Sequence, residues 1–339
     1  MSSYVSNLEL PTVAKKFLAA QSIMITTHAK PDGDAFGSVV ALTQALRDMG
    51  KDVRGLLMGP VPQAFCNLMG YSSVELYDAG DPLPDVELFV VVDTGAWSQL
   101  EPMRTLLQDK TDQMLIIDHH LNGDTPAKDK YIDGKAAACC EIIAQVVELV
   151  GGERDLLSDV LIAEALYIGI ASDTGWFRFS NCRPQTHQLA AKLLSHGVDH
   201  AMLYLQCEQA ERAEKLKLLG RALASLRFVA DETAAIMTLR AEDFRQTGAL
   251  TEETERFVDI PQVVGSVQMV VLICEPLHEG DPIRASFRSK PGPNAVNVAE
   301  LAQQFGGGGH ARAAGAKMQG DLDEVVEKIA SALEAAHNG

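Results

Sequence analysis

Three short apolar runs in the first half of the chain each end at a histidine or an aspartate. Residues 22–27 end at His28, residues 88–92 end at Asp93, and residues 114–117 end at Asp118. The runs are short and partly β-branched, which predicts three buried strands. In an open parallel sheet, residues just past the carboxyl ends of the strands line the ligand crevice.

Helical patterns separate these strands. Residues 36–49 and 137–150 predict helices closed by glycines as C-terminal caps, and residues 161–171 predict a longer, buried helix. Alternation of strand and helix predicts an α/β fold, with a doubly wound, mainly parallel sheet in the N-terminal domain.

The second half of the chain has a different pattern. Residues 183–226 predict successive helices, and strands recur from residue 227 onward. The expected strands are residues 228–229, 235–239, 267–274 and 283–289. We therefore expect an α/β domain over residues 1–195, a helical connector over 196–226 and a smaller α+β domain over 227–339, with the active site in the cleft between the domains.

The composition and net charge of the chain restrict the kinds of ligand that it can bind. The chain has 339 residues, is 47% hydrophobic and carries a formal net charge of −17, so it is long enough for two cores but a basic surface is not expected. Sequence-independent binding of long nucleic acid needs a basic track along many phosphates. Any phosphate-bearing substrate should therefore be small, and we expect no long nucleic acid track.

Six cysteines are scattered without C-x-x-C spacing, which predicts free, mostly buried thiols rather than disulfides or a thiolate zinc site. There is no signal-peptide pattern, and no uncharged apolar run reaches membrane-spanning length. These features predict a cytoplasmic protein that does not enter membranes. A homodimer is compatible with the sequence, which leaves the oligomeric state open.

Acidic residues and histidines gather in four clusters at the ends of the apolar runs. The members are His28, Asp32 and Asp34; Asp93; Asp118, His119 and His120; and Asp173. Taken singly, each aspartate is more simply a helix cap or a turn residue. Taken together they are not explained by capping, because caps do not require histidine.

Carboxylates and imidazoles together suit Mn²⁺, Mg²⁺ or Zn²⁺, and the absence of cysteine from the set favours Mn²⁺ or Mg²⁺. Several carboxylates crowded in one crevice would repel one another without cations to neutralise them. The sequence therefore predicts a metal centre.

The four clusters resemble the motifs of the DHH phosphoesterase family. The matching stretches, in order, are His28-x-x-x-Asp32-x-Asp34, Asp93-Thr94-Gly95, Asp118-His119-His120 and Ser172-Asp173-Thr174-Gly175. The version with His28 is similar to the branch that contains oligoribonuclease and pAp phosphatase enzymes, sometimes called nanoRNases.

The resemblance implies two divalent cations, with Mn²⁺ expected first and Mg²⁺ as the alternative. Asp93 is expected to bridge them, since the two oxygens of one carboxylate can hold ions about 3.5–4 Å apart. The other expected ligands are His28 and Asp32 for one ion, and Asp34, His119 and Asp173 for the other.

The catalytic residues that the resemblance implies are Asp93, Asp118, His119 and His120. Asp118 precedes the ligand His119 and is expected to orient an imidazole. His120 is expected to hydrogen-bond the phosphate or the leaving oxygen, with a hydrogen-bonding role in the core as the alternative.

A glycine-rich stretch in the second half provides an independent signal. Residues 306–309 are four glycines, followed by His310 and Arg312 and preceded by Arg284 and Arg288. Glycines let the backbone approach a ligand closely, and their N–H groups form an anion-binding nest when a helix follows. The alternative is a flexible linker, although linkers are rarely bracketed by a phenylalanine and a His-x-Arg pair.

This stretch resembles the DHH-associated C-terminal domain, where it binds substrate. The expected substrate-binding residues are Arg284, Arg288, Gly307, Gly308, Gly309, His310 and Arg312. Arg178 is a further candidate because aromatic residues flank it and can stack on a base. Its alternative is a surface cation beside core aromatics.

The resemblance as a whole implies a metal-dependent phosphoesterase that hydrolyses very short oligoribonucleotides to nucleoside monophosphates, and pAp to AMP, with a metal-activated water. One alternative keeps this chemistry but acts on linear or cyclic dinucleotide signals, or on pyrophosphate. Another is a non-catalytic nucleotide-binding regulatory module. The sequence leaves the choice between short RNA and pAp open, because both present a nucleotide phosphate to the same kind of site.

Overall fold

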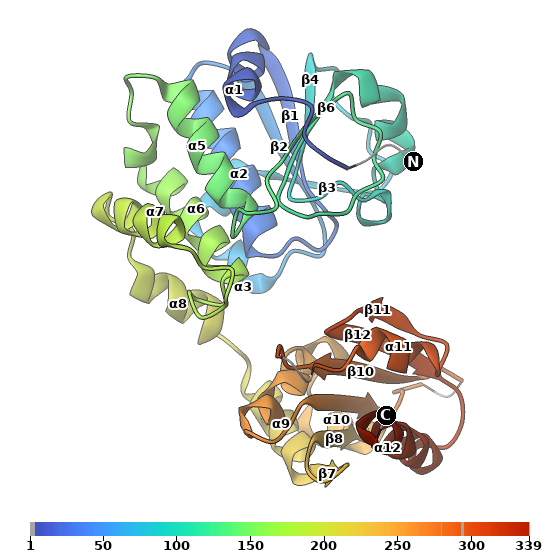
Figure 1. Cartoon of the computed structure of the whole chain (residues 1–339). Coiled ribbons are helices and arrows are strands. Elements are labelled where there is room, and N and C mark those ends of the chain that lie inside the picture. Colours follow the sequence, from blue (N-terminus) through green and yellow to red (C-terminus); the bar gives the residue numbers. More distant parts are fainter. Residues whose placement is uncertain (1–3, 279, 293–294, 339) are drawn as a thin grey trace. The chain divides into compact units, whose positions relative to one another are not determined.

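The computed structural model describes residues 4–278, 280–292 and 295–338, and the chain divides into two compact units, Met1–Ala210 and Glu211–Gly339 (Figure 1). The segment predicted to be helical, residues 183–226, includes the expected connector and is divided between these units. The helices α7 (Pro184–Ser195) and α8 (His200–Glu208) belong to the first unit, and α9 (Ala213–Ala224) belongs to the second.

The first unit is built on a parallel six-stranded sheet with the order β3-β2-β1-β4-β5-β6. Its strands are β1 (Ser22–Thr26), β2 (Asp52–Met58), β3 (Glu75–Tyr77), β4 (Leu88–Val92), β5 (Met114–Asp118) and β6 (Asp129–Ile132). This is the order of a doubly wound sheet, in which the direction of winding reverses between β1 and β4. The predicted fold class and the three predicted strands are confirmed, whereas β2, β3 and β6 were not anticipated.

Helices cover both faces of this sheet, as parallel sheets require. On one face pack α1 (Leu10–Ala19), α2 (Gly33–Asp48), α5 (Cys139–Gly151) and α6 (Val160–Asp173). On the other face pack η2 (Trp97–Gln99) and α4 (Arg104–Leu107). Successive residues of β4 enter the two cores in turn, so the whole strand is buried and reads as a continuous apolar run.

Shorter helices complete the first unit. They are α3 (Gln63–Cys66), η1 (Met69–Ser73), η3 (Gln108–Gln113) and η4 (Leu156–Ser158). The helices predicted at residues 36–49, 137–150 and 161–171 correspond to α2, α5 and α6. Because α6 continues to Asp173, that aspartate lies in the last turn of a helix.

The second unit has a mixed sheet with the order β11-β12-β10-β9-β8-β7, in which β8 and β9 are the parallel pair. Its strands are β7 (Arg227–Val229), β8 (Ala234–Leu239), β9 (Met269–Cys274), β10 (Ile283–Ser289), β11 (Gly308–His310) and β12 (Ala313–Met318). Its remaining helices are α10 (Ala241–Thr247), η5 (Thr251–Thr254), η6 (Phe257–Val263), α11 (Val298–Gln303) and α12 (Leu322–Asn338). The predicted smaller α+β domain is confirmed.

The glycine-rich stretch departs from expectation. The last glycines enter strand β11, and a strand, β12, follows instead of a helix. A Cβ added at Gly307 would overlap the carbonyl oxygen of Gly315, and one at Gly309 would lie 2.5 Å from that of Ala313. The expected helix-terminal nest was therefore wrong, and two of the glycines are needed for close packing against β12.

Two further expectations concern cysteines and membranes. All six cysteines are free; three are buried and three are partly buried. None of the described helices combines the length and the apolar character needed to cross a membrane.

Candidate metal centre

The switch point of the parallel sheet carries the predicted cluster. His28 follows β1, Asp93 follows β4, and His119 follows β5, so adjacent strands deliver these three side chains to one edge. Asp93 has a left-handed backbone with φ of +61°. Such a conformation is uncommon for a residue with a side chain and is found mostly where function over-determines the backbone.

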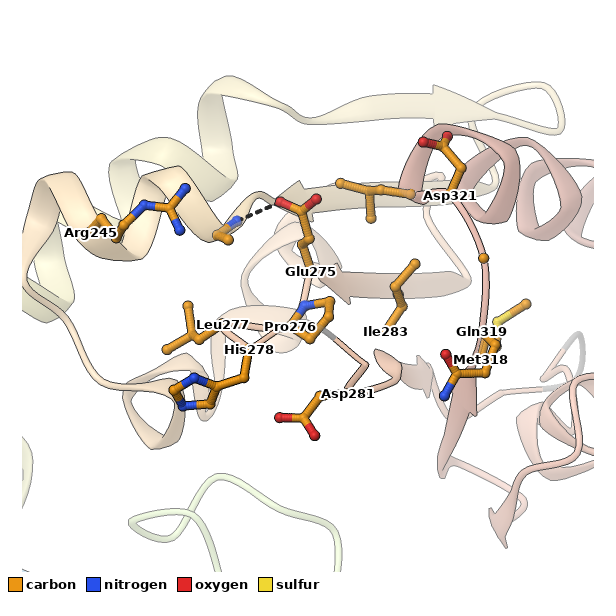
Figure 2. Close-up of a pocket in the computed structure, with 13 residues that line it drawn as sticks. Arg245, Glu275, Pro276, Leu277, His278, Asp281, Ile283, Met318, Gln319 and Asp321 are labelled. Carbon is orange, nitrogen blue, oxygen red and sulfur yellow. Dashed lines mark hydrogen bonds between the residues drawn. The ribbon is translucent and has the colours of Figure 1, made fainter.

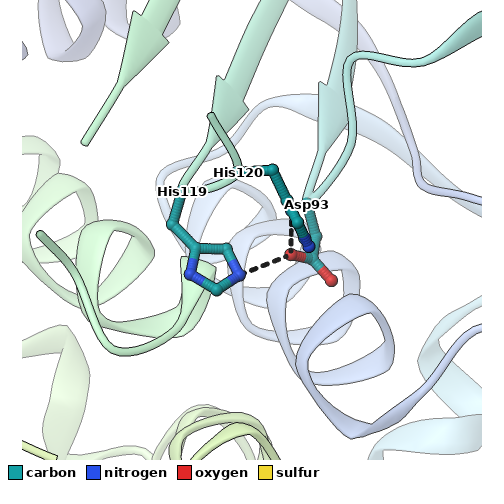
Figure 3. A group of neighbouring side chains, drawn as sticks. All are labelled: Asp93, His119 and His120. Atoms are coloured by element: carbon teal, nitrogen blue, oxygen red, sulfur yellow. Dashed lines mark ion pairs between the residues drawn. The ribbon is translucent and has the colours of Figure 1, made fainter. Parts of the chain in front are cut away.

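Asp93 lies between two imidazoles. Its Oδ2 is 3.6 Å from Nε2 of His28, and its Oδ1 is 3.4 Å from Nε2 of His119. His120 also approaches, with Nδ1 3.7 Å from the same Oδ1 (Figure 3). The two oxygens of a single, 2% exposed carboxylate therefore face different partners.

Three aspartates complete two groups around this carboxylate. Asp32 joins His28, with Oδ1 3.9 Å from Nε2. Asp34 and Asp173 join His119, with Oδ2 atoms 3.7 Å and 3.3 Å from its Nε2. Within each group one ligand atom per residue lies within 4.8 Å of the others, which is compact enough for one ion.

Two atoms at the centre are buried without a hydrogen bond. Among the described residues, Oδ1 of Asp93 and Nε2 of His119 have no hydrogen-bond partner, although they are close to each other. Unpaired buried polar atoms cost about 1–3 kcal/mol each and call for an explanation such as an ion.

Backbone carbonyls fix the two imidazoles from behind. Nδ1 of His28 lies 3.0 Å from the carbonyl oxygen of Ala29, and Nδ1 of His119 lies 3.4 Å from that of Ala136. A carbonyl can only accept, so each Nδ1 carries a proton, and a ring that gives up its second proton turns an Nε2 lone pair toward the carboxylates. Metal-binding histidines are usually held in this way.

Helix ends place the two aspartates that follow His28. Asp32 is the N-cap of α2, and its Oδ1 accepts from the N–H groups of Asp34 and Ala35 at 3.0 Å each. Asp34 is fully buried and accepts from the N–H groups of Cys139 and Cys140, at the first turn of α5, at 2.5 Å and 2.8 Å. A carboxylate at a helix N-terminus is favoured by the helix dipole.

Asp118 does not contribute to any of the groups around Asp93 in the described chain. Its Oδ1 accepts from the N–H groups of His119 and His120 and pairs with Nδ1 of His120 at 2.8 Å. Its Oδ2 accepts from the Tyr4 hydroxyl. The imidazole that Asp118 holds is therefore that of His120, which is 54% exposed.

A polar network behind the centre, with Glu141 and Thr186 as its buried members, was missed in the sequence. The Asn181 amide donates to the carbonyl oxygens of Ala137 and Asp173, and Glu141 accepts from the N–H of Ala137 at 2.8 Å. Glu141 also accepts from Arg183 at 2.6 Å and from the Thr186 hydroxyl. A glutamate inside the apolar start of α5 was the available signal, since a charge buried there requires partners.

Charge interactions inside the centre are strong. Burial, reinforced by neighbouring carboxylates, raises the pKa of Asp173 to about 7 and that of Asp34 well above its usual range. Burial disfavours the charged imidazoles, but Asp93 and the other neighbouring carboxylates, with the Ala29 carbonyl beside His28, together outweigh it and raise the pKa of His28 to about 9 and that of His119 to about 10. Burial alone would raise the pKa of Asp93, yet the two imidazoles lower it.

These residues fit a divalent cation. The donors are hard carboxylate and imidazole atoms, two of them are buried and unpaired, and the ring orientations are fixed for coordination. A cation would also relieve the carboxylate repulsion that raises the pKa values of Asp34 and Asp173.

The second unit brings several predicted substrate residues onto one face of its sheet. Arg284 and Arg288 alternate on β10 and pair with Lys317 and Ala313 of β12, while His310 of β11 pairs with the same Ala313. Directly paired residues share a face. We call Arg284, Arg288, His310 and Lys317 the basic face; Lys317 was not anticipated.

The apolar residues of β9 on this face are covered by a core that includes residues of α9 and η6. Beyond β9, the polar side chains on this face come from alternate residues of β10, from Lys317 of β12 and from His310 of β11. Arg288 pairs with Asp259 at 3.5 Å, and Arg284 donates weakly to the Thr251 carbonyl at 3.4 Å. Arg312 is exposed in the turn between β11 and β12, and Gly308 has open space where a Cβ would be.

Arg178 lies in the first unit, shortly after Asp173. Its Nε donates to the carbonyl oxygen of Gly175 at 2.7 Å, and its guanidinium lies 6.0 Å from the ring centre of Phe179. Phe179 is 55% exposed, whereas Trp176 and Phe177 pack against the core of the first unit. Phe179 is therefore available to stack on a base, whereas Trp176 and Phe177 are structural residues.

A pocket of about 310 Å³ in the second unit does not involve the predicted site. Its described lining includes Glu275, His278, Asp281 and Asp321, and none of the predicted substrate residues (Figure 2). Glu275 accepts from the N–H of Ala241, and Asp321 accepts from the first N–H groups of α12. Both carboxylates are therefore helix caps.

A doubly wound sheet with a carboxylate–imidazole cluster at its switch point, joined to a mixed-sheet unit, defines a two-domain α/β protein of the kind that binds divalent metals. Residues 22–170 match the DHH family N-terminal domain, and residues 247–337 match the DHHA1 domain. The chain is 32% identical to the bifunctional oligoribonuclease and PAP phosphatase NrnA of Thermus thermophilus, over 92% of this chain and 89% of that protein. The chain therefore belongs to the DHH family and carries a DHHA1 domain.

Two further comparisons agree. The protein of the same name from Bacillus subtilis is 28% identical, over 92% of this chain and 94% of that protein. The solved structure of an exopolyphosphatase-related protein from Bacteroides fragilis superposes with a TM-score of 0.86 at 24% identity, covering 97% of this chain and 96% of that one. The latter shows that the fold is shared.

Proposed function

We propose that this protein is a metal-dependent phosphoester hydrolase that cleaves very short oligoribonucleotides to nucleoside monophosphates and converts pAp to AMP. The observation that carries the proposal is the position of Asp93, whose two oxygens face two separate imidazole-carboxylate groups. Relatives named for these two activities match over nine tenths of the chain.

We propose two divalent cations, Mn²⁺ in preference to Mg²⁺, because imidazole ligands suit Mn²⁺ better. One would be held by His28, Asp32 and Asp93, and the other by Asp34, His119 and Asp173, with Asp93 shared. Bound there, such ions lower the pKa of a coordinated water and neutralise phosphate charge. The nearby Cys139 belongs to none of the compact groups found among the described residues, and its thiol donates to the Ile117 carbonyl at 3.4 Å.

The protein's own groups position the substrate. His120 holds one ring nitrogen on Asp118 and is 54% exposed, so its other nitrogen is free to donate to a phosphate or leaving oxygen. The basic face supplies guanidinium groups suited to bidentate phosphate binding. A short substrate agrees with a net charge of −17, which does not support a long basic track.

The test is a comparison of substrates with purified protein and Mn²⁺. A 5′-phosphorylated dinucleotide, a longer single strand, pAp, a cyclic dinucleotide and pyrophosphate are supplied side by side, and the released products are measured. Fastest cleavage of the dinucleotide, with turnover of pAp, supports the proposal. Preference for the longer strand or the cyclic dinucleotide would assign that molecule as the substrate instead. No turnover of any of the five would favour a non-catalytic binding module.

A further inference from the structure

The segment before α1 reaches the candidate active site through one side chain. The Tyr4 hydroxyl donates to Oδ2 of Asp118, a residue 114 positions further along the chain. The opposite oxygen of Asp118 holds Nδ1 of His120 at 2.8 Å. Tyr4, Asp118 and His120 thus form a continuous chain of hydrogen bonds that ends at an exposed imidazole.

We propose that Tyr4 is a positioning residue for catalysis, which acts on the substrate through Asp118 and His120. This inference rests on the proposed function, in which His120 contacts the phosphate or the leaving oxygen. The Tyr4 hydroxyl donates to Asp118, and no hydrogen bond joins it to the described residues around Asp93.

Two glycines form the niche for the Tyr4 ring. A Cβ added at Gly95, in the loop after β4, would overlap the Tyr4 hydroxyl oxygen. One added at Gly123, in the loop after His120, would lie 2.5 Å from a ring carbon of Tyr4. Both loops therefore leave room for this ring, and a larger residue at either position would displace it.

Polar contacts along the outer strand β6 fix the segment that carries Tyr4. The Asn7 side chain accepts from the N–H of Lys130 at 2.7 Å and donates to the carbonyl of Lys128 at 2.7 Å. The Ser6 hydroxyl accepts from the N–H of Ile132 at 2.7 Å and contacts its carbonyl oxygen at 2.9 Å. These contacts cover a sheet edge that would otherwise be open, and they set the position of Tyr4.

Asp118 depends on the hydroxyl of Tyr4. The carboxylate is fully buried, and among the described residues Tyr4 is the partner of its Oδ2. Without that donor the carboxylate is held on one side and is free to rotate toward another donor. The imidazole of His120 then loses its fixed orientation, whereas the side chains of His28, Asp34 and Asp173 have no hydrogen bond to Asp118 among the described residues and keep their contacts.

The test is Tyr4→Phe, which removes the hydroxyl and keeps the ring. We expect kcat for a 5′-phosphorylated dinucleotide to fall about tenfold, the scale typical of partners that orient an active-site imidazole, with KM and Mn²⁺ affinity unchanged. Tyr131→Phe is the matched control, because the Tyr131 hydroxyl on β6 has no hydrogen-bond partner in the described structure and its loss should leave kcat unchanged.

A double-mutant cycle separates positioning from general destabilisation. If Tyr4 acts through His120, Tyr4→Phe added to His120→Ala lowers kcat no further. Fully additive losses, or a wild-type kcat in Tyr4→Phe alone, overturn the inference.

A measurement without substrate keeps this test distinct from that of the proposed function. In metal-free protein, NMR resonances of the His120 ring should move in Tyr4→Phe while those of His28 stay. If the wild-type protein cleaves none of the substrates, the proposed function fails, and the ring resonances still decide whether Tyr4 orients His120. Unmoved His120 resonances would refute that.

Discussion

Nε2 of His119 lies 3.4 Å from Oδ1 of Asp93, and both atoms are buried without a hydrogen bond to any described residue. The remaining nitrogen of His119 is occupied by the Ala136 carbonyl, and the remaining oxygen of Asp93 faces His28. These two atoms face the same position without a hydrogen bond between them. This is the arrangement expected of two ligands of one metal ion. This relationship supports the predictions that follow.

Replacing Asp93 with asparagine should inactivate the protein. The side chain keeps its size but loses the negative charge that two groups share, so we expect kcat/KM for the dinucleotide to fall more than about a hundredfold, beyond the usual cost of removing an orienting partner. Mn²⁺ affinity, measured by calorimetry, should fall as well. Asp81→Asn, at an exposed position outside the cluster, is the control. Full activity of Asp93→Asn would contradict the shared-ligand assignment.

His119 and His120 should differ in their effects on metal. His120→Ala removes a group that Asp118 holds, and we expect a lower kcat with metal content largely intact. His119→Ala removes a buried nitrogen that faces three carboxylates, and we expect metal to be lost. Metal analysis of both variants after dialysis decides the matter. Complete loss of metal from His120→Ala would make it a ligand instead.

Metal binding should release protons and strengthen with pH. The pKa values of His28 and His119 are raised to about 9 and about 10, so both imidazoles are protonated at pH 7 in the metal-free protein and must lose protons to bind a cation. Apparent affinity should therefore rise with pH until about pH 9 to 10. Calorimetry in buffers of different ionisation enthalpy counts the protons. Zero release at pH 7 would show that the imidazoles do not exchange protons for metal.

The same raised pKa values affect the metal-free fold in a defined direction. A histidine whose folded pKa lies above the unfolded value of about 6.5 stabilises the fold most below that pH. This contribution is lost progressively as pH rises from about 6.5 and is gone above about 9 to 10. The melting temperature of EDTA-treated protein should therefore fall over this pH range. In the His28→Gln variant the melting temperature should fall less.

The basic face should govern substrate binding. Arg284 is exposed on β10 and makes one long hydrogen bond, so it is available for phosphate. Arg284→Ala should raise KM for the dinucleotide about tenfold, as expected for a charge-assisted hydrogen bond, with a smaller effect on kcat. Arg245→Ala is the control, because Arg245 pairs with Glu242 and lines the other pocket. Equal changes in both variants would point to net charge alone.

The elements that could be predicted from the sequence are those with a strong local pattern of apolar residues. The β4 run is apolar throughout because both faces of a central parallel strand are buried, and α6 shows the same continuous burial. Edge strands are half exposed and short, so β3 and β6 have no such signature. The glycine-rich stretch was assigned to a nest because glycine permits many conformations, and pairing with β12 selected one of them.

The sequence by itself determined which residue types would meet, since each motif lies where an apolar run ends and parallel strands end at one edge. Only the tertiary structure decided how they meet. In the tertiary structure Asp34 accepts from the first N–H groups of α5, and Asp118 pairs with the imidazole of His120. The Tyr4 hydroxyl donates to Asp118 across 114 positions of the chain. These contacts join segments far apart in the chain, and no local periodicity encodes them, because they depend on how packed elements close against one another.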